Sequence, residues 1–145
     1  MSYEVKEYMT KEVNTIDYNA TVIDAAKIMA KDKKFEGYVI TLKKGKPLGI
    51  VTERDIINKV LARELDPSKT SVAEIMSSPL ITVEPEDDLL KTADLMSKYN
   101  VRKLVVVRDE IIYGLITAKN IAQSCGEYVD KSIKDMIRWS APLNI

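Results

Sequence analysis

The spacing of apolar residues in the first half of the chain changes from one segment to the next. A short run alternates with a period of two, as in a half-buried strand. Apolar residues then recur at the three- and four-residue spacing of an amphipathic helix, and Thr21 is a suitable N-cap before Val22. Two runs rich in β-branched residues around a charged turn predict a hairpin, and a second helix follows. These elements, in the order β-α-β-β-α, are expected at residues 13–16, 21–31, 37–42, 48–52 and 53–64.

The second half of the chain repeats this pattern. Eight residues are identical at an offset of 67 positions, and a later block, GIVTERDI at 49–56, matches GLITAKNI at 114–121 at an offset of 65. We place the two missing residues in the hairpin turn, where a deletion is tolerated. A helix capped by Asp87 or Asp88 is expected in this copy. The eight identical pairs are Val5/Val72, Glu7/Glu74, Met9/Met76, Thr15/Thr82, Ala26/Ala93, Met29/Met96, Lys31/Lys98 and Val39/Val106.

The repeat predicts the domain organisation. Repeat 1 should span residues 5–66 and repeat 2 residues 72–128, joined by the linker DPSKTS. A unit of about 60 residues buries too little apolar surface to be stable alone. We therefore expect the two copies to pack their sheets together about a pseudo-twofold axis, as one module of the α/β (α+β) class.

A C-terminal tail, 129–145, is expected to pack on this module. It contains a third echo of the segments that precede the two repeats, which we call the lead-in segments. SIKDMI at 132–137 resembles EVKEYM at 4–9 and SVAEIM at 71–76. Two interpretations stay open: a generic amphipathic turn, or a segment that packs as the two lead-in segments do.

Composition narrows the classes of function. Lys plus Arg and Asp plus Glu both number 22, so no basic excess points to nucleic acid or to an anionic membrane. The chain has no histidine and one cysteine, Cys125, which argues against a zinc site and an internal disulfide. No apolar run approaches the roughly 18 residues of a membrane span, and the N-terminus lacks a signal-peptide core. We therefore expect a cytoplasmic protein without a metal site.

The stretch GIVTERD at 49–55 places Thr52 and Asp55 where a strand passes into a helix. In one interpretation Thr52 only caps the helix and Asp55 only faces its macrodipole. In the other, the helix N-terminus and the threonine hydroxyl bind a phosphate, and the carboxylate accepts hydrogen bonds from a ribose diol. Gly49 leaves room for close approach. The second interpretation predicts a nucleotide site.

The doubled unit resembles the cystathionine β-synthase (CBS) domain pair, from about Val5 to Tyr128. The lead-in pattern V-x-E-x-M, the strand threonines and the endings G-I-V-T-E-R-D and G-L-I-T-A-K-N carry the resemblance. It implies a two-lobed, stand-alone module with two clefts, which commonly forms a homodimer. It also implies regulatory binding of AMP, ADP, ATP, S-adenosylmethionine or NAD, with no required cofactor and no catalysis.

For single residues, the resemblance implies that the better cleft belongs to repeat 1. Asp55 matches the ribose-binding aspartate, and Thr52 matches the threonine on the phosphate side. Arg102 and Lys103 match a basic pair that reaches the phosphates from the other copy. The remaining matches, near the adenosine, are Asn14, Thr15, Ile16, Tyr38 and Val39.

The second cleft departs from the family pattern, because Asn120 stands where the aspartate should be. On its opposite wall Phe35 and Glu36 replace the basic pair, and Glu36 would repel phosphate. We expect a weaker or altered site here, or one that prefers a less charged adenosine ligand. The residues assigned to this cleft are Thr82, Thr117, Lys119 and Asn120.

The sequence thus favours a non-catalytic sensor of adenosine nucleotides that modulates a partner protein. An enzyme is disfavoured, because the sequence has no histidine, no metal-ligand cluster and no thiol–base pair. Two alternatives stay open: a nucleic-acid-binding role for the basic hairpin at 41–46, and a ligand-free dimerisation scaffold.

Overall fold

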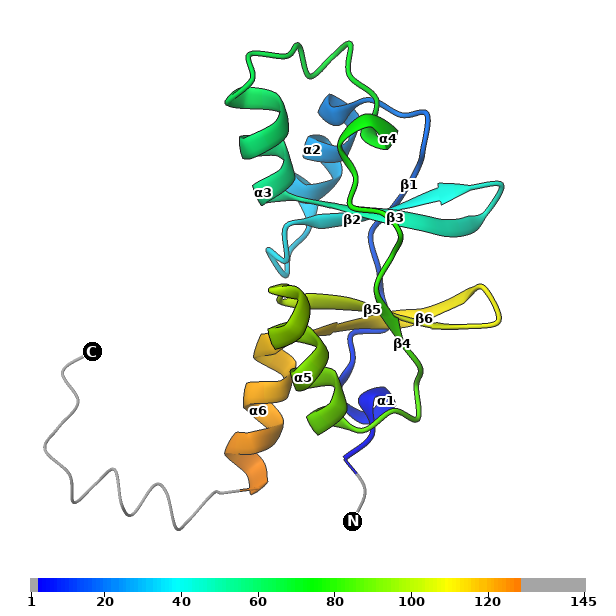
Figure 1. Cartoon of the computed structure of the whole chain (residues 1–145), viewed down its shortest axis with the longest axis vertical. Helices are drawn as coiled ribbons and strands as arrows, with labels where there is room; N and C mark the ends of the chain where they lie inside the picture. The colour runs from blue at the N-terminus through cyan, green and yellow to red at the C-terminus, as the bar shows by residue number, and fades with distance from the viewer. Residues whose placement is uncertain (1–2, 129–145) are drawn as a thin grey trace, which may run out of the picture.

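The computed structural model describes residues 3–128, so the C-terminal tail lies outside the described residues. Its helices are α1 (Val5–Tyr8), α2 (Val22–Lys31), α3 (Glu53–Ile56), the π-helix η1 (Ile57–Leu61), α4 (Val72–Ile75), α5 (Leu89–Tyr99) and α6 (Ala118–Tyr128). Its strands are β1 (Thr15–Asp17), β2 (Tyr38–Lys43), β3 (Lys46–Thr52), β4 (Thr82–Val83), β5 (Lys103–Arg108) and β6 (Ile111–Thr117). Two sheets lie between two layers of helices (Figure 1). None of the helices within residues 3–128 combines the length and apolar character that crossing a membrane requires.

The two sheets have the same topology. In each sheet the first strand runs parallel to the second, and the second and third form an antiparallel hairpin. With the two major helices of each half, this confirms the predicted β-α-β-β-α order. The two-residue difference between the halves does not lie in the hairpin turn, however. Thr41 pairs with Gly49 as Val106 pairs with Gly114, so the offset is already 65 within the hairpins.

The loop before the hairpin therefore holds the two extra residues, and our placement of the deletion was wrong. Residues 32–37 connect α2 to β2, whereas residues 100–102 connect α5 to β5, and α5 is one residue longer than α2, which leaves a net difference of two. Phe35 and Gly37 in the longer loop have positive φ angles of 53° and 60°. As a consequence, Lys103 occupies the position that Tyr38 has in the first half.

Side-chain caps fix where the longer helices begin. Thr21 and Asp24 form a reciprocal capping box at the start of α2, as predicted. Asp88 caps α5, because its carboxylate accepts a hydrogen bond from the Lys91 N–H at 2.7 Å. The helix expected at 53–64 is instead a turn of α3 continued by η1, which ends at Leu61.

The middle strands are buried on both faces. Val39 and Leu104 point to the helices of their own halves, where they lie in two separate hydrophobic clusters. The residues on either side of Val39, and the residue after Leu104, point the other way into a third cluster between the sheets. Its fully buried members are Tyr38, Ile40, Val105 and Leu115. This contact packs the sheets face to face, as expected from repeats that cannot be buried alone.

The lead-in segments are exchanged between the halves. α1 precedes the first sheet in sequence, yet it lies beside the second sheet, and α4 lies beside the first (Figure 1). Val5 is fully buried in the cluster of the second half, and Val72 in that of the first. Each half is therefore completed by the lead-in segment that precedes the other half in sequence.

Two glycines make this exchange possible, because a lead-in segment lies directly on each. A Cβ at Gly49 would stand 2.7 Å from the Ser77 carbonyl oxygen and 2.9 Å from the Met76 sulfur. A Cβ at Gly114 would stand 2.5 Å from the Thr10 carbonyl oxygen. The glycine in each G-h-h-T stretch is thus required by chain packing.

We expect Gly49→Ala to destabilise the protein by about 1–3 kcal/mol, because the Ser77 backbone has to move to admit the methyl group. Urea unfolding measures this loss. Lys46→Ala, at an exposed position of the same strand, should change stability far less. Equal stabilities of the two variants would contradict the close contact.

Candidate functional site

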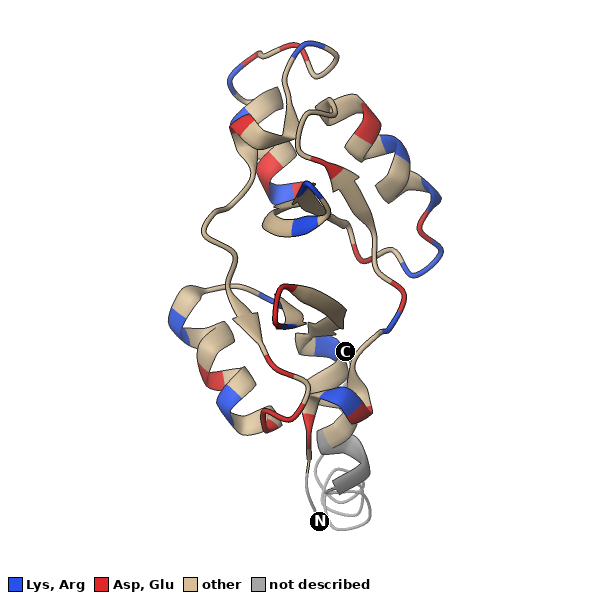
Figure 2. Cartoon of the chain, turned by 90° about the vertical axis from the view of Figure 1, so that its right-hand side faces the viewer, with Lys and Arg blue, Asp and Glu red and all other residues tan. Residues whose placement is uncertain are grey.

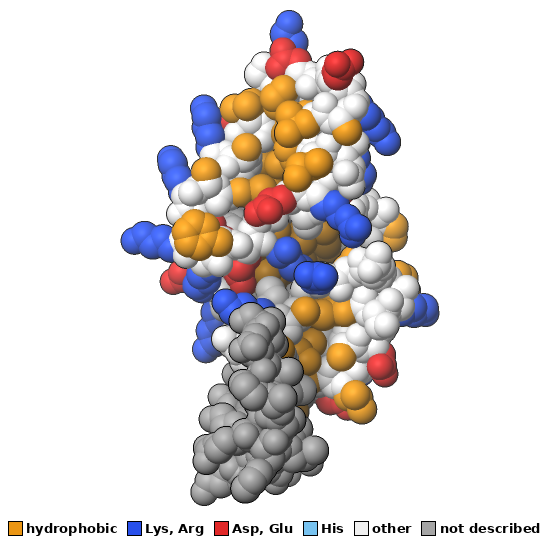
Figure 3. All heavy atoms as spheres, turned by 90° about the vertical axis from the view of Figure 1, so that its left-hand side faces the viewer, with side chains coloured by type: hydrophobic (Ala, Val, Ile, Leu, Met, Phe, Trp, Pro, Cys, Tyr) orange, Lys and Arg blue, Asp and Glu red, His pale blue; other side chains and the backbone are white. Residues whose placement is uncertain are grey.

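A cleft of about 930 Å³ lies between the two halves. Figure 3 shows it as a hollow with basic side chains at its edge. Four stretches form its walls: the loop before β2, the end of β3 with the helix that follows it, the connection after α4, and the loop that leads into β5. The lining residues are Phe35, Glu36, Gly37, Ile50, Thr52, Glu53, Arg54, Asp55, Ile57, Asn58, Ser77, Pro79, Leu80, Ile81, Asn100, Val101, Arg102, Lys103 and Val105.

Thr52 and Asp55 meet at the wall formed by α3. One Asp55 oxygen accepts hydrogen bonds from the Thr52 N–H at 2.9 Å and from its hydroxyl at 3.2 Å. The other oxygen pairs with the Lys59 ammonium at 3.0 Å. Lys59 also donates to the Ile75 carbonyl at 2.9 Å, which ties α4 to this wall. The capping interpretation of Thr52 and Asp55 therefore holds, and it leaves one carboxylate lone pair, on the oxygen that faces Lys59, available to a ligand.

The second half has a neutral version of this arrangement. The Asn120 side-chain oxygen accepts hydrogen bonds from the Thr117 N–H and hydroxyl, both at 2.9 Å. Ser124 stands at the position of Lys59 and donates to the Ile121 carbonyl at 2.6 Å. The carboxylate and its counter-ion are thus both replaced by neutral groups.

Charges of both signs line the cleft. Arg54, Arg102 and Lys103 supply positive charge, and Glu36 and Glu53 oppose it. Burial raises the pKa of Glu36, and the nearby Asp32 carboxylate adds to this, whereas Lys103 and Lys119 act in the opposite direction. Because Asp55 has its own counter-ion, the basic residues remain available to an anionic ligand.

Of the residues assigned to the first cleft, the structure brings together Thr52, Asp55, Arg102 and Lys103. The other five are absent from its lining. Ile16 and Val39 lie in the hydrophobic core of the first half, where their side chains cannot reach a ligand. Residues not brought to the cleft are Asn14, Thr15, Ile16, Tyr38 and Val39.

Asn14 and Tyr38 instead form a separate hydrogen-bonded group. The Asn14 N–H donates to the Tyr38 hydroxyl at 3.1 Å, and its side-chain amide donates to Asp32 at 3.0 Å. Burial raises the pKa of Tyr38 to about 12, and its side chain is fully buried. These contacts fix the start of β2.

Two assignments to the opposite wall of the second cleft are corrected. Phe35 and Glu36 line the first cleft, together with Thr52 and Arg102, because the longer loop before β2 carries them there. The residues assigned to the second cleft do not line this one. They are Thr82, Thr117, Lys119 and Asn120.

Sequence reasoning missed the stretch Ser77–Ile81, which lines the cleft because the lead-in segments are exchanged. It also missed Lys59. A signal for Lys59 existed, since an Asp–Lys pair at i,i+4 in the first repeat becomes Asn–Ser in the second. Among the described residues no group of three or more Cys, Asp or Glu side chains is placed to hold a metal ion.

The fold and the cleft define a tandem pair of β-α-β-β-α repeats with a site between them. The chain belongs to the CBS domain family, which it matches over residues 5–62 and 72–127. The CBS domain-containing protein YhcV of Bacillus subtilis is 30% identical over 118 residues, which are 81% of this chain and 82% of YhcV. Two further curated relatives that the chain matches are longer, and it spans 69% and 62% of their lengths.

Two solved structures extend the comparison. The hexameric CBS-CP12 protein from bloom-forming cyanobacteria is 33% identical, with a TM-score of 0.79 over 95% of this chain and 78% of that one. The CBS domain pair of protein MJ0100, in complex with 5′-methylthioadenosine and S-adenosyl-L-methionine, is 30% identical. Its TM-score is 0.78 over 88% of this chain and 99% of the other.

We expect Lys59→Ser to destabilise the protein by about 1–3 kcal/mol, since Asp55 loses its counter-ion in a largely buried position. Asp55→Asn combined with Lys59→Ser copies the second repeat and should cost less than the sum of the single changes. A double-mutant cycle followed by urea unfolding measures the coupling.

The exposed pair Lys46–Glu110, at 2.9 Å, is the matched control and should show coupling of roughly 0.5 kcal/mol or less. Additive effects at Asp55 and Lys59 would show that the two side chains are not energetically linked.

Proposed function

We propose that this protein is a regulatory, non-catalytic module that binds an adenosine nucleotide in the cleft between its two halves. One observation carries the proposal: Thr52 and Asp55 from one half face the same cleft as Arg102 and Lys103 from the other. A hydroxyl and carboxylate opposite two cations match a ligand with a ribose at one end and phosphates at the other.

In this proposal Asp55 accepts a hydrogen bond from a ribose hydroxyl through the lone pair that Thr52 and Lys59 leave unused. Arg102 binds the phosphate through its planar guanidinium, and Lys103 adds a point charge. The apolar stretch Leu80–Ile81, opposite α3, supplies a surface for the base.

The ligand complexes of the MJ0100 domain pair support the adenosyl class of ligand. Within that class, the three basic residues of the cleft favour AMP, ADP or ATP over S-adenosylmethionine. Ligand binding would change a partner protein by stabilising one arrangement of the two halves, to the extent that the ligand prefers that arrangement.

The second cleft is proposed to be weaker. By the pseudo-twofold relation, Asn14 and Thr15 belong beside Thr117, Lys119 and Asn120. Tyr38 occupies there the position that Lys103 has in the first cleft, and its ring is fully buried between the sheets. A buried phenol in place of a cation leaves less room and no charge for phosphate.

We also propose that the protein forms a homodimer. Ile57, Leu61 and Leu65 are 56%, 58% and 43% exposed. Their four-residue spacing forms an apolar row on one side of the first half, where Figure 3 shows hydrophobic side chains gathered. The hexameric relative supports self-association in this family.

A nucleic-acid role for the hairpin at 41–46 is less well supported. Lys46 pairs with Glu110 at 2.9 Å, and Lys43 lies over the Tyr18 ring at 5.3 Å. Basic and acidic residues are interspersed over both halves, as Figure 2 shows. Within residues 3–128 this distribution is unlike the basic stripe that binds a phosphate backbone.

We expect one of AMP, ATP and S-adenosylmethionine to bind at about one per chain in a calorimetric titration. Arg102→Ala should weaken nucleotide binding by roughly tenfold, because a charge-assisted contact to phosphate is lost. Arg63→Ala, at an exposed position outside the cleft, is the matched control. If the two variants bind the nucleotide with equal affinity, the nucleotide does not bind in this cleft.

Glu36→Gln is expected to strengthen ATP binding by roughly two- to fivefold, because it removes a repelling carboxylate from the cleft. Binding of methylthioadenosine, which has no phosphate, should stay the same. In the wild type, lowering the pH through the raised pKa of Glu36 protonates this group and should give part of the same gain. This gain in affinity should be absent in Glu36→Gln. If both proteins respond to pH in the same way, the response comes from titration of the ligand and not of Glu36.

A further inference from the structure

The first feature to consider is the surface that holds α1 on the second half, which we call the α1 docking site. It consists of the loop Glu84–Asp88, the buried cluster around Val83 and the strand segment Gly114–Leu115. The Val5 and Lys6 N–H groups donate to the Asp87 and Pro85 carbonyls, both at 2.9 Å. Thr10 exchanges two backbone hydrogen bonds with Leu115, at 2.8 and 2.9 Å.

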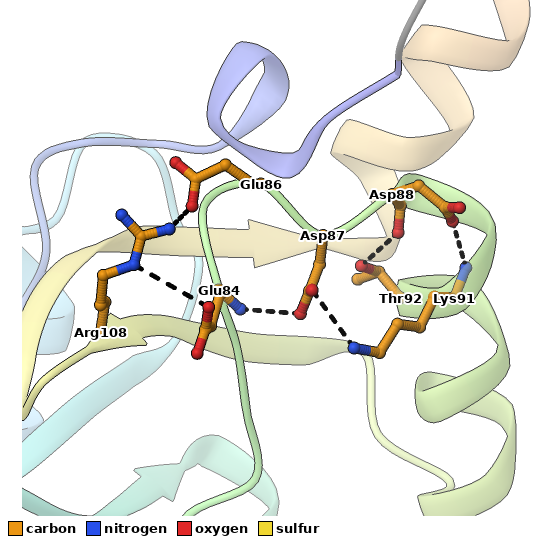
Figure 4. Close-up of polar contacts among 7 residues, drawn as sticks. All are labelled: Glu84, Glu86, Asp87, Asp88, Lys91, Thr92 and Arg108. Carbon is orange, nitrogen blue, oxygen red and sulfur yellow. Dashed lines mark hydrogen bonds and ion pairs between the residues drawn. The ribbon is translucent and has the colours of Figure 1, made fainter.

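The loop of the α1 docking site is held rigid by its own side chains (Figure 4). Asp87 accepts from the Glu84 N–H at 2.9 Å and pairs with Lys91 at 3.2 Å. Arg108 pairs with Glu84 at 3.8 Å and also with Glu86. The two carbonyls that receive α1 are therefore presented in a fixed geometry.

The first half has a matching site for α4, but with different charge. The Val72 and Ala73 N–H groups donate to the Ala20 and Tyr18 carbonyls at 2.8 and 3.3 Å. The loop there reads DYNAT, where the second half reads EPEDD. Asn19 stands in the place of Glu86, which lies 4.0 Å from Lys6. The segment on the acidic site has a lysine, Lys6, directly after its buried valine. The segment on the less acidic site has Ala73 at the same position.

The tail carries a third segment of this kind. It has the same order of residue types as the two lead-in segments: a polar residue at the cap position, an apolar residue at the buried position, an acidic residue two positions later, and then two large side chains. These positions are held by Ser132, Ile133, Asp135, Met136 and Ile137. Lys134 stands at the position of Lys6, where the segment that binds the first half has Ala73. The segment shares one identity with each lead-in segment, Lys134 with Lys6 and Ser132 with Ser71. The charge of Lys134 is what matches residues 132–137 to the α1 docking site, where Glu86 lies near Lys6.

We propose that residues 132–137 of the same chain are an alternative occupant of the α1 docking site. The first half is completed by the lead-in segment that follows it in sequence, and residues 132–137 follow the second half in the same way. Two segments of one chain thus compete for one site, and α1 holds it in this structure.

The tail can reach the site without leaving its own chain. α1 contacts α6, and both lie toward the same end of the molecule in Figures 1 and 2. α6 ends at Tyr128, and the steps from there to Ser132 span up to roughly 14 Å. When the tail is bound, residues 3–10 are released, so a partner of either end of the chain shifts the competition.

The test uses the full-length chain and a pair of matched substitutions. Val72→Asp should lower the melting temperature by roughly 10 °C or more, because α4 has no substitute and a charge enters the core. Val5→Asp should lower it clearly less, because Ile133 takes the place of Val5. Ile133→Asp alone should leave it near the wild-type value, and Val5→Asp with Ile133→Asp should lose as much as Val72→Asp.

Trp139, the single tryptophan of the chain, reports the exchange directly. In Val5→Asp its emission should shift to shorter wavelength and iodide should quench it less, and adding Ile133→Asp should reverse both changes. The proposal is overturned if Val5→Asp and Val72→Asp lose equal stability and Ile133→Asp changes neither Trp139 signal. A Trp139 change that depends on protein concentration would overturn docking within one chain. If the aspartate variants fail to fold, Val5→Ala and Val72→Ala give the same comparison.

Discussion

The face-to-face contact of the two sheets is the constraint on which the rest of this structure depends. The middle strand of each sheet alternates between two apolar surroundings, as Val39 and Ile40 do in β2. Helices of one half cover only one of these faces. The other face, with Tyr38, Val105 and Leu115, is buried only when the second sheet packs against it. Neither half is therefore a stable unit without the other.

The exchange of lead-in segments adds a second link between the halves, and it also creates the cleft. After leaving α4 on the first half, the chain crosses to β4 on the second half, and Ser77–Ile81 line the cleft on the way. Lys59 binds both Asp55 and the last carbonyl of α4. Asp55 is thus linked through Lys59 to the end of α4, from which the chain crosses to the second half, so the geometry of the cleft is coupled to the packing of α4.

The sequence was sufficient for the order of elements, the cap at Thr21, the choice of Asp87 or Asp88 as the second cap, and four residues of the cleft, because these depend on local spacing and on short motifs. It was insufficient for features set by long-range packing. Nothing local in V-x-E-x-M tells which half it completes. Residues 14–16 were therefore expected beside Thr52, where the structure instead has the stretch that follows α4. The extra residues of the loop at 32–37 were also misplaced, because the Val39/Val106 identity suggested a register that strand pairing does not use.

Differences between the two repeats occur together at positions whose side chains contact one another. Asp55 and Lys59 in the first repeat become Asn120 and Ser124, so removal of the charge is accompanied by removal of its counter-ion. At the strand position of Lys103 the first repeat has Tyr38, which is buried and bonded to Asn14. An asparagine at position 55 alone would leave Lys59 without its carboxylate partner, and a small side chain in place of Tyr38 would leave a space between the sheets. The coordinated changes leave one charged, open cleft and one position filled by a phenol ring, while the backbone fold stays the same.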